Sequence, residues 1–230
     1  MSVGDFGRIG GEASDPGVGT ASGALVAAEL DAVTIDAYGT LVTLVDPVPE
    51  LTTALEQRGV VCNPDTVAAA FRTEVAHYGK HSGEGHDEEG LARLQRDCAQ
   101  FFLDAAGAGL DADEFAPVYA GAMHFELLPG VVESLERLHS LGLELAVVGN
   151  WDLTLHRHLE EIGLARHFSA VVHAARKPAP DGLLRALAEL GVEPARALHI
   201  GDDGADEGAA RAAGTHFAPA PLPAAAAALA

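Results

Sequence analysis

The sequence predicts an α/β protein in which a parallel β-sheet is flanked by helices and carries an inserted helical-bundle domain. Short apolar segments of β-type composition alternate with segments whose apolar residues recur at helical spacing. The alternation is interrupted once, over residues 45–124, where helical patterns follow one another without a convincing strand. A helical insertion after the first strand explains this gap.

Five apolar segments are predicted to be strands, because each is short and is followed by a polar or glycine-containing loop. They are residues 33–36, 144–148, 169–172, 197–201 and 216–218. Amphipathic helices fill the spaces between them, with apolar residues three or four positions apart. Their core-facing residues are Val131, Val132, Leu135 and Leu138, then Leu155, Leu159 and Ile162, then Leu183, Leu184, Leu187 and Leu190. The insertion contains four further helical patterns, at residues 48–58, 65–78, 87–106 and 111–123.

These patterns divide the chain into a core domain and a second domain. The α/β core comprises residues 30–44 and 125–222, and the helical domain comprises residues 45–124. Residues 1–29 mix Gly, Ser, Asp and small apolar residues without a period, which predicts a disordered N-terminal arm. Residues 223–230 are rich in alanine and are predicted to be a low-complexity tail.

The composition limits the partners and the cellular setting. The chain has 34 Asp and Glu against 14 Lys and Arg, a formal net charge of −20 at pH 7. Such a surface repels nucleic acid and anionic membranes, so we expect neither as a partner. Its two cysteines, Cys62 and Cys98, have no CxxC spacing, which argues against a disulfide framework or a structural zinc site. With no signal-like block and no membrane-length apolar run, the expected location is the cytoplasm.

Polar residues follow four of the predicted strands. Ligands of an open parallel sheet bind beyond the carboxyl ends of its strands, so these residues are the candidate site. They are Asp36, Tyr38 and Thr40; Gly149, Asn150 and Asp152; Arg176 and Lys177; and Asp202, Asp203, Asp206 and Glu207. Each alone is an ordinary loop or helix-cap residue. Their joint occurrence at one edge of one sheet is what indicates a site.

The predicted cluster of Asp36, Asp202 and Asp206 requires a compensating charge. Two carboxylates about 4 Å apart repel by roughly 4 kcal/mol at an effective dielectric constant of about 20. The cluster therefore calls for a cation, for protonation, or for both. Carboxylate and carbonyl oxygens suit Mg²⁺, and Lys177 could neutralise a nucleophilic carboxylate or a transferring oxyanion.

Four segments, in order, resemble the motifs of the haloacid dehalogenase-like (HAD) hydrolase superfamily. They are IDAYGTL at 35–41, VVGN at 147–150, RKPAP at 176–180 and HIGDDGADEGAARAAG at 199–214. The resemblance covers the chain from about residue 32 to residue 220 and implies a Rossmann-like core. The insertion resembles the helical cap domain that this superfamily places after the first strand, which would close over bound substrate.

The resemblance implies a role for each matched residue. Asp36 would be an aspartyl nucleophile that forms a covalent intermediate, later hydrolysed by water. Lys177 would stabilise the charge around Asp36, and Asn150 would assist catalysis. The substrate site would include Tyr38, Thr40 and Gly149, and Mg²⁺ would be held by Asp36, the carbonyl of Tyr38, Asp202 and Asp206. Whether Asp203 or Glu207 shares the metal role is left open.

Two departures from the superfamily pattern keep the reaction open. Tyr38 stands where the phosphatases of the superfamily have a second Asp that protonates the leaving group, and a tyrosine with a reference pKa near 10 is a poor proton donor at pH 7. The same DAYGTL string resembles the 2-haloacid dehalogenases, which displace halide and need no such acid. Gly149 stands where a Ser or Thr is usual, so a hydroxyl contact to substrate is missing.

Three functions are therefore weighed. The acidic fourth motif and the KPAP segment favour Mg²⁺-dependent hydrolysis of a small, anionic phosphorylated metabolite. Tyr38 favours carbon–halogen hydrolysis of the 2-haloacid dehalogenase type, for which Arg58, Arg72, Arg93 and Arg96 could clamp a carboxylate, although their spacing also suits solvated helix faces. The two departures together allow a catalytically weak, capped protein that binds a metabolite or a metal. Substrate identity and oligomeric state cannot be read from the sequence.

Overall fold

The computed structural model of the 230-residue chain describes residues 27–229. The predicted arm lies outside the described residues up to position 26, and Ala27–Glu29 form a short 3-10 helix, η2, rather than part of a disordered arm. The chain divides into two compact units. The α/β unit comprises residues 27–43, 127–150 and 154–229, and the helical unit comprises residues 44–126 and 151–153.

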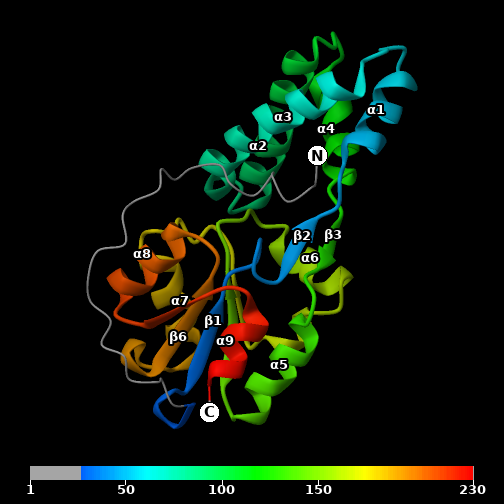
Figure 1. The fold of residues 1–230 in the computed structure, drawn as a ribbon. Helices are drawn as coiled ribbons and strands as arrows, with labels where there is room; N and C mark the ends of the chain where they lie inside the picture. The colour runs from blue at the N-terminus through cyan, green and yellow to red at the C-terminus, as the bar shows by residue number, and fades with distance from the viewer. Residues whose placement is uncertain (1–26, 230) are drawn as a thin grey trace, which may run out of the picture. The chain divides into compact units, whose positions relative to one another are not determined.

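The α/β unit is built on a five-stranded parallel sheet with the strand order β5-β4-β1-β6-β7 (Figure 1). The strands are β1 (Ala32–Ile35), β4 (Glu144–Val148), β5 (Ala170–Val172), β6 (Ala197–Gly201) and β7 (His216–Pro219). All five predicted strands are confirmed, with ends displaced by at most one residue. β1 is central and every residue in it is buried, as expected for a strand covered on both faces.

Helices cover both faces of this sheet. Figure 1 shows α7 and α8 on one face and α5 and α9 on the other. The helices of the unit are α5 (Val131–Ser140), α6 (Leu155–Glu161), α7 (Asp181–Leu190), α8 (Gly204–Ala213) and α9 (Leu222–Ala228), with 3-10 helices η4 (Ala165–His167) and η5 (Pro194–Arg196). The α7–α8 face packs small side chains, such as Ala146, Ala186 and Ala209, against the strands. Close packing of this kind fixes the strand ends that carry the site.

The C-terminal segment departs from the sequence prediction of an Ala-rich tail at residues 223–230. Leu222–Ala228 form helix α9, in which Leu222 and Ala226 are buried. Arg137 of α5 donates hydrogen bonds to the carbonyls of Ala226 and Leu229, both at 2.9 Å, so the helix end is capped by a side chain. Alanine is the strongest helix former. The alanine-rich segment that was predicted to be a low-complexity tail therefore forms a helix that packs on the core. Neither α9 nor any other helix among residues 27–229 has the length and apolar character of a membrane span.

The helical unit has its own apolar core. Its helices are α1 (Val48–Glu56), α2 (Pro64–His81), α3 (Glu88–Ala106) and α4 (Ala112–Gly121), with the 3-10 helix η3 (Ser82–Glu84). Leu51, Phe71, Phe102 and Phe115 are among the buried residues that pack together. The chain enters and leaves this unit through β2 (Val42–Leu44) and β3 (Phe125–Leu127), which pair as a two-stranded sheet. The sequence prediction missed these two short strands.

One boundary differs from the predicted division of the chain. Trp151–Leu153 belong to the helical unit, although they follow β4 and were expected in the core. The hydroxyl of Tyr78 donates to Asp152 Oδ2 at 3.2 Å, the Asp152 amide donates to the same hydroxyl at 3.3 Å, and the Leu153 amide donates to the Gly85 carbonyl at 2.8 Å. These long-range contacts have no signature in the local sequence pattern. They assign Asp152 to the helical unit, although it follows a strand of the core.

Candidate active site

Asp36 lies directly beyond the end of β1. Its amide donates to the carbonyl of Ile200 at 2.9 Å, so the backbone is still tied to β6 at the position where the side chain leaves the sheet. The carboxyl group is buried. Burial raises the pKa of Asp36 to about 6, and the neighbouring Asp206 and Asp202 charges add to the effect while Lys177 opposes it. Asp36 is therefore ionised at neutral pH but poorly solvated, which favours reactivity.

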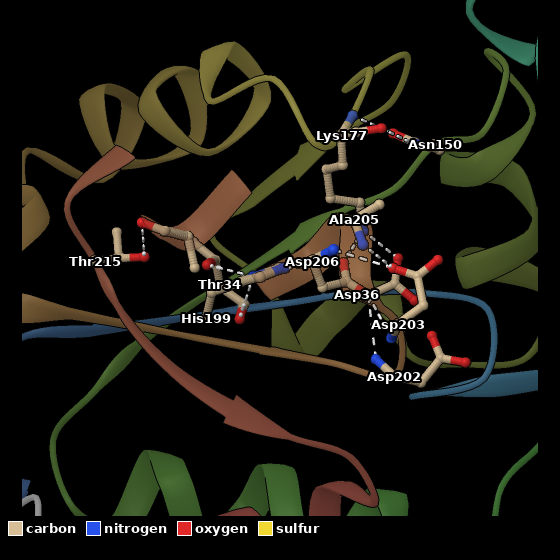
Figure 2. Close-up of polar contacts among 11 residues, drawn as sticks. Thr34, Asp36, Asn150, Lys177, His199, Asp202, Asp203, Ala205, Asp206 and Thr215 are labelled. Carbon is tan, nitrogen blue, oxygen red and sulfur yellow. Dashed lines mark hydrogen bonds and ion pairs between the residues drawn. The ribbon is translucent and has the colours of Figure 1, made fainter. Parts of the chain in front are cut away.

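Lys177 supplies the positive charge at this strand edge. Its Nζ lies 2.5 Å from Asp36 Oδ1 and 2.5 Å from Asp206 Oδ1, and only 3% of the side chain is exposed. Burial opposes the charged form of Lys177, but the two carboxylates outweigh it and raise its pKa above the ordinary value. A permanently charged ammonium thus joins two buried carboxylates (Figure 2).

The loop that carries Lys177 is held by Asn150. The Lys177 amide donates to Asn150 Oδ1 at 2.7 Å, and Asn150 Nδ2 donates to the Lys177 carbonyl at 2.9 Å. The preceding residue, Arg176, has a left-handed backbone with φ 58°, a conformation that needs outside support in a residue other than glycine. The sequence predicts a catalytic role for Asn150, and the structure shows its side-chain amide in contact with the backbone of Lys177. Asn150 thus ties the loop after β4 to the backbone of Lys177.

Asp206 is the most completely hydrogen-bonded carboxylate of the site. Oδ1 accepts from Lys177 Nζ at 2.5 Å and lies 3.1 Å from His199 Nε2, while Oδ2 accepts from the amides of Asp202 and Asp203 at 3.1 and 3.2 Å. Burial opposes its ionisation, but hydrogen bonds from His199 and Lys177 outweigh burial and hold the pKa of Asp206 well below its usual range. Four donors occupy the four lone-pair positions that a carboxylate offers.

Asp203 closes the start of α8 rather than facing the site. Its Oδ1 accepts from the amides of Ala205 and Asp206 at 2.8 and 3.0 Å, forming a capping box with Asp206. Glu207 is exposed on the same helix. Neither belongs to the group of carboxylates that could share an ion among the described residues.

Asp202 approaches the backbone of the first motif so closely that only glycine fits there. A Cβ atom added to Gly39 would lie 2.3 Å from Asp202 Oδ2, and Gly39 has a left-handed φ of +82°. Burial, together with the charges of Asp206 and Asp203, raises the pKa of Asp202 to about 6. The carboxylate is thus turned toward Asp36 and the loop that follows it, in an environment that already carries excess negative charge.

Comparison with known proteins places the chain in one family. A family model described as haloacid dehalogenase-like hydrolase matches residues 30–214. The chain belongs to the haloacid dehalogenase-like hydrolase family. It is therefore a hydrolase.

The relatives of this hydrolase include proteins named for different reactions. Haloacid dehalogenase-like hydrolase domain-containing protein 3 of Xenopus laevis is 31% identical, over 80% of this chain and 81% of that protein. Phosphoglycolate phosphatase 1 of Pseudomonas aeruginosa is also 31% identical, over 76% of this chain and 65% of that protein. The L-2-haloacid dehalogenase of Xanthobacter autotrophicus has a similar fold, with a TM-score of 0.60 at 24% identity over 83% of this chain and 77% of its own.

The donor set of this hydrolase fits a hard divalent cation. Asp36, Asp202 and Asp206 each offer an oxygen within 4.8 Å of the others, and Lys177 is the cation that contacts two of them. Three carboxylates against one ammonium leave an excess of negative charge that a bound cation would neutralise. Because both oxygens of Asp206 already accept two hydrogen bonds each, Asp36 and Asp202 are the better placed ligands.

Three further residues were predicted to contact substrate. Thr40 is buried, and its Oγ1 has no hydrogen-bond partner within residues 27–229. The amide of Gly149 donates to the Val172 carbonyl at 3.0 Å, so this group extends the β4–β5 ladder and is not available to a substrate. Tyr38 forms an isolated β-bridge with Val42, which fixes the backbone whose carbonyl was predicted to hold Mg²⁺.

The sequence analysis missed Thr34 and His199 as contributors to the site. Both are fully buried in the sheet, on β1 and β6, and the imidazole reaches Asp206. The available signal was a polar residue in each of two otherwise apolar strands. A packed histidine is the ordinary interpretation of that pattern, and only the pairing of the strands shows that the two residues meet.

Proposed function

We propose that this hydrolase removes the phosphoryl group from a small phosphorylated metabolite, using Asp36 as the nucleophile and Mg²⁺ as the cofactor. The observation that carries the proposal is the group of Asp36, Asp202 and Asp206 around Lys177, in which negative charge exceeds positive charge. The similarity to phosphoglycolate phosphatase 1 of Pseudomonas aeruginosa supports a phosphorylated substrate. A substrate of this kind is anionic and small.

The proposed reaction has two steps. An Asp36 carboxylate oxygen attacks the phosphorus, the bond from phosphorus to the leaving oxygen breaks, and that oxygen takes a proton from solvent. Water then attacks the phosphorus of the aspartyl phosphate, which releases inorganic phosphate and restores the carboxylate. Two displacements replace one difficult hydrolysis.

The side chains of the site have distinct duties in these steps. Asp36 must be ionised to attack, and with a pKa of about 6 it is ionised above that pH. Lys177 stays on Asp36 Oδ1 and offsets the negative charge that accumulates as the phosphoryl group transfers. Asn150 holds the backbone of Lys177, and the Thr40 hydroxyl offers a donor to substrate. Mg²⁺, held by Asp36, Asp202 and the Tyr38 carbonyl, would neutralise the phosphoryl oxygens when bound.

Tyr38 leaves the proposed phosphatase without a carboxylic acid beside the leaving group. General acid assistance contributes about 10²- to 10⁴-fold in typical enzymes, so we expect a slow phosphatase or one that prefers substrates with good leaving groups. Replacing Tyr38 by Asp should raise turnover of alkyl phosphates more than turnover of aryl phosphates. An unchanged ratio between the two substrate types would contradict this role for position 38.

Carbon–halogen hydrolysis is the second candidate, and Tyr38 is the observation that favours it. The surroundings of the arginines weigh against it. The Arg58 guanidinium lies 5.5 Å from the centroid of Phe115, Arg93 pairs with Glu89, and Arg96 pairs with Asp113 at 2.7 Å. These side chains are exposed and already engaged within the helical unit. An anionic haloacid would also be repelled by the carboxylates around Asp36 in the absence of a metal.

We further propose that the helical unit is a cap that selects the substrate and that the protein works in the cytoplasm. The cap assignment rests on its insertion between β2 and β3 and on its separate core. The cytoplasmic setting is supported by the acidic composition and by the two cysteines, which are unpaired. Exchange of cap residues should alter substrate preference without abolishing hydrolysis.

The test is a panel of phosphorylated metabolites, including 2-phosphoglycolate, alongside short-chain 2-haloacids, each assayed with Mg²⁺ and with EDTA. We expect phosphate release that requires Mg²⁺ and disappears in Asp36→Asn. Halide release that persists in EDTA would overturn the phosphatase proposal. Lys177→Met is assayed with the same panel of substrates. Lys80→Met is its matched control, because Lys80 is exposed in the helical unit.

A further inference from the structure

Two fully buried polar side chains lie behind the site and take no part in the proposed steps. Thr34 on β1 and His199 on β6 are both 0% exposed, and they are partners in the parallel register of these strands. Residues in register on neighbouring strands project to the same face of a sheet. The imidazole therefore lies beside the Thr34 side chain, next to the first turn of α8, which carries Asp206 (Figure 2).

The contact of the ring with Asp206 requires a proton on one of its two nitrogens, Nε2. His199 Nε2 lies 3.1 Å from Asp206 Oδ1, and an ionised carboxylate can only accept, so Nε2 is the donor. His199 Nδ1 lies 2.9 Å from Thr34 Oγ1 and 3.1 Å from the Thr34 carbonyl. A hydroxyl that donates to Nδ1 leaves the proton on Nε2, whereas a carbonyl alone would draw a proton to Nδ1. A Thr34 hydroxyl that donates to Nδ1 would therefore favour the tautomer that donates to Asp206.

The carboxylate anchored in this way also determines where Lys177 lies. Asp206 Oδ2 is held by the amides of Asp202 and Asp203, and Oδ1 is shared between His199 and Lys177. If His199 did not donate, Oδ1 would lose one of its two partners in a site where an unpartnered polar atom is costly. Lys177 would then be the only donor left on Oδ1, so the position of its ammonium relative to Asp36 would be less firmly fixed.

We propose that Thr34 and His199 are positioning residues whose hydrogen-bonded chain, from hydroxyl through imidazole to Asp206, holds Lys177 on the nucleophile Asp36. The expected fall in kcat rests on the proposed function, whereas the hydrogen-bonded chain itself does not. Burying a polar pair costs free energy, and an apolar pair could replace it in an ordinary sheet. A positioning role explains why Thr34 and His199 are found here. Neither residue is proposed to touch the substrate.

The kinetic test uses a graded set of variants at the two positions. His199→Met removes the donor at similar volume, and His199→Gln keeps an N–H close to the position of Nε2. We expect kcat to fall about 10- to 100-fold in His199→Met, in line with the loss of a residue that orients a site group. KM should change little, and His199→Gln should recover much of the loss. Thr34→Val should lower kcat by an intermediate factor.

Matched controls separate positioning from stability. Thr215→Val removes a hydroxyl that donates to the Ala210 carbonyl at 3.3 Å on the same side of the unit, and His167→Gln alters a buried histidine on η4. Both should leave kcat unchanged. If His199→Met and Thr34→Val are folded and keep the kcat of the wild type, or if the controls lose as much activity, the positioning role is overturned.

A spectroscopic readout tests the geometry without any substrate. Long-range ¹H–¹⁵N correlation spectra of ¹⁵N-histidine-labelled protein show which ring nitrogens are protonated, and the signal missing in His199→Gln identifies His199. We expect a proton on Nε2 in the wild type and a new proton on Nδ1 in Thr34→Val. A wild-type ring with a bare Nε2 would overturn the inference. Absence of phosphatase activity in the wild type would instead contradict the proposed function. The spectrum would then still test the hydrogen-bonded chain from Thr34 through His199 to Asp206.

Discussion

Two buried carboxylates, one in each unit of the molecule, have opposite environments. Asp206 in the α/β unit is 1% exposed and accepts from an ammonium, an imidazole and two backbone amides. Glu74 in the helical unit is 4% exposed, and its Oε2 accepts from the hydroxyl of Tyr119 at 2.5 Å, with the Cys98 thiol as a second donor. The pKa of Asp206 lies well below the usual range, whereas burial raises the pKa of Glu74 above its ordinary value.

The difference shows that the two units stabilise a buried acid in different ways. The helical unit tolerates a buried acid by surrounding it with neutral donors, and burial likewise raises the pKa of Tyr119 and of Cys98. The α/β unit instead stabilises ionised carboxylates by placing Lys177 and His199 among them. An arrangement that maintains charge in a buried place is expected of a catalytic site and is unusual in a structural core.

The largest expected effect follows from neutralising the nucleophile. Asp36→Asn should lower turnover by more than about 10³-fold, as for other residues that act covalently. At pH 7 in the absence of metal it should also stabilise the fold, by an amount on the order of 3 kcal/mol, because ionising a buried acid with a pKa of about 6 is unfavourable. Chemical denaturation and a phosphate-release assay measure the two changes.

The raised pKa of Asp36 makes this stability effect depend on pH. The pKa of Asp36 is higher in the folded chain than in the unfolded chain, so its contribution favours folding below the unfolded pKa and is lost as pH rises through about 6. The advantage of Asp36→Asn should therefore shrink as pH falls from 7 toward 4. A variant that is less stable than the wild type at pH 7 would contradict the unfavourable charge at Asp36.

The next largest effect is seen when Asp206 and Glu74 are each changed from the acid to the corresponding amide. Asp206→Asn removes the charge that Lys177 and His199 depend on and should destabilise the protein by about 3 to 5 kcal/mol, as for broken buried ion pairs. Glu74→Gln should change stability by less than about 1.5 kcal/mol, since its partners are neutral donors. Unfolding followed by circular dichroism gives both values, and equal losses would remove the distinction drawn here.

The smallest effect concerns the pH dependence of the helical unit. Because the folded pKa of Glu74 is raised, its contribution to stability is full below the unfolded pKa and is lost as pH rises through the folded value. The stability of the wild type relative to Glu74→Gln should therefore decline as pH is raised from 4 toward 7. Trp151, the single tryptophan of the chain, lies in the helical unit, and its fluorescence reports this transition. A constant difference would indicate an ordinary pKa.

Much of the fold and of the site could be predicted because local patterns encode them. The strands ending before Asp36 and Asp202 are short apolar runs, and both residues lie where the prediction placed them. The parts that could not be predicted depend on contacts between distant segments. The amide of Gly149 is engaged by β5, and the side chain of Asn150 by the backbone of Lys177, and neither contact leaves a trace in the residues around it.

Two other discrepancies have physical causes of the same kind. Helix α9 has the composition of a featureless tail, and its helical state depends on Arg137 and on packing against α5. The Thr34–His199 pair depends on a strand register that joins residues 165 positions apart. Sequence patterns reveal where a polar residue lies on its own element, whereas the partner that determines its role becomes visible only in the assembled sheet.

Detection of the covalent intermediate tests directly whether Asp36 is the nucleophile. Wild-type protein is mixed with Mg²⁺ and a hydrolysed phosphorylated metabolite, quenched with acid within one turnover, digested and examined by mass spectrometry. We predict a phosphoryl group on the peptide that contains Asp36, at a level that Lys177→Met reduces and Asp36→Asn abolishes. Phosphate release at the wild-type rate from Asp36→Asn, or a phosphoryl group on another residue, would contradict Asp36 as the nucleophile.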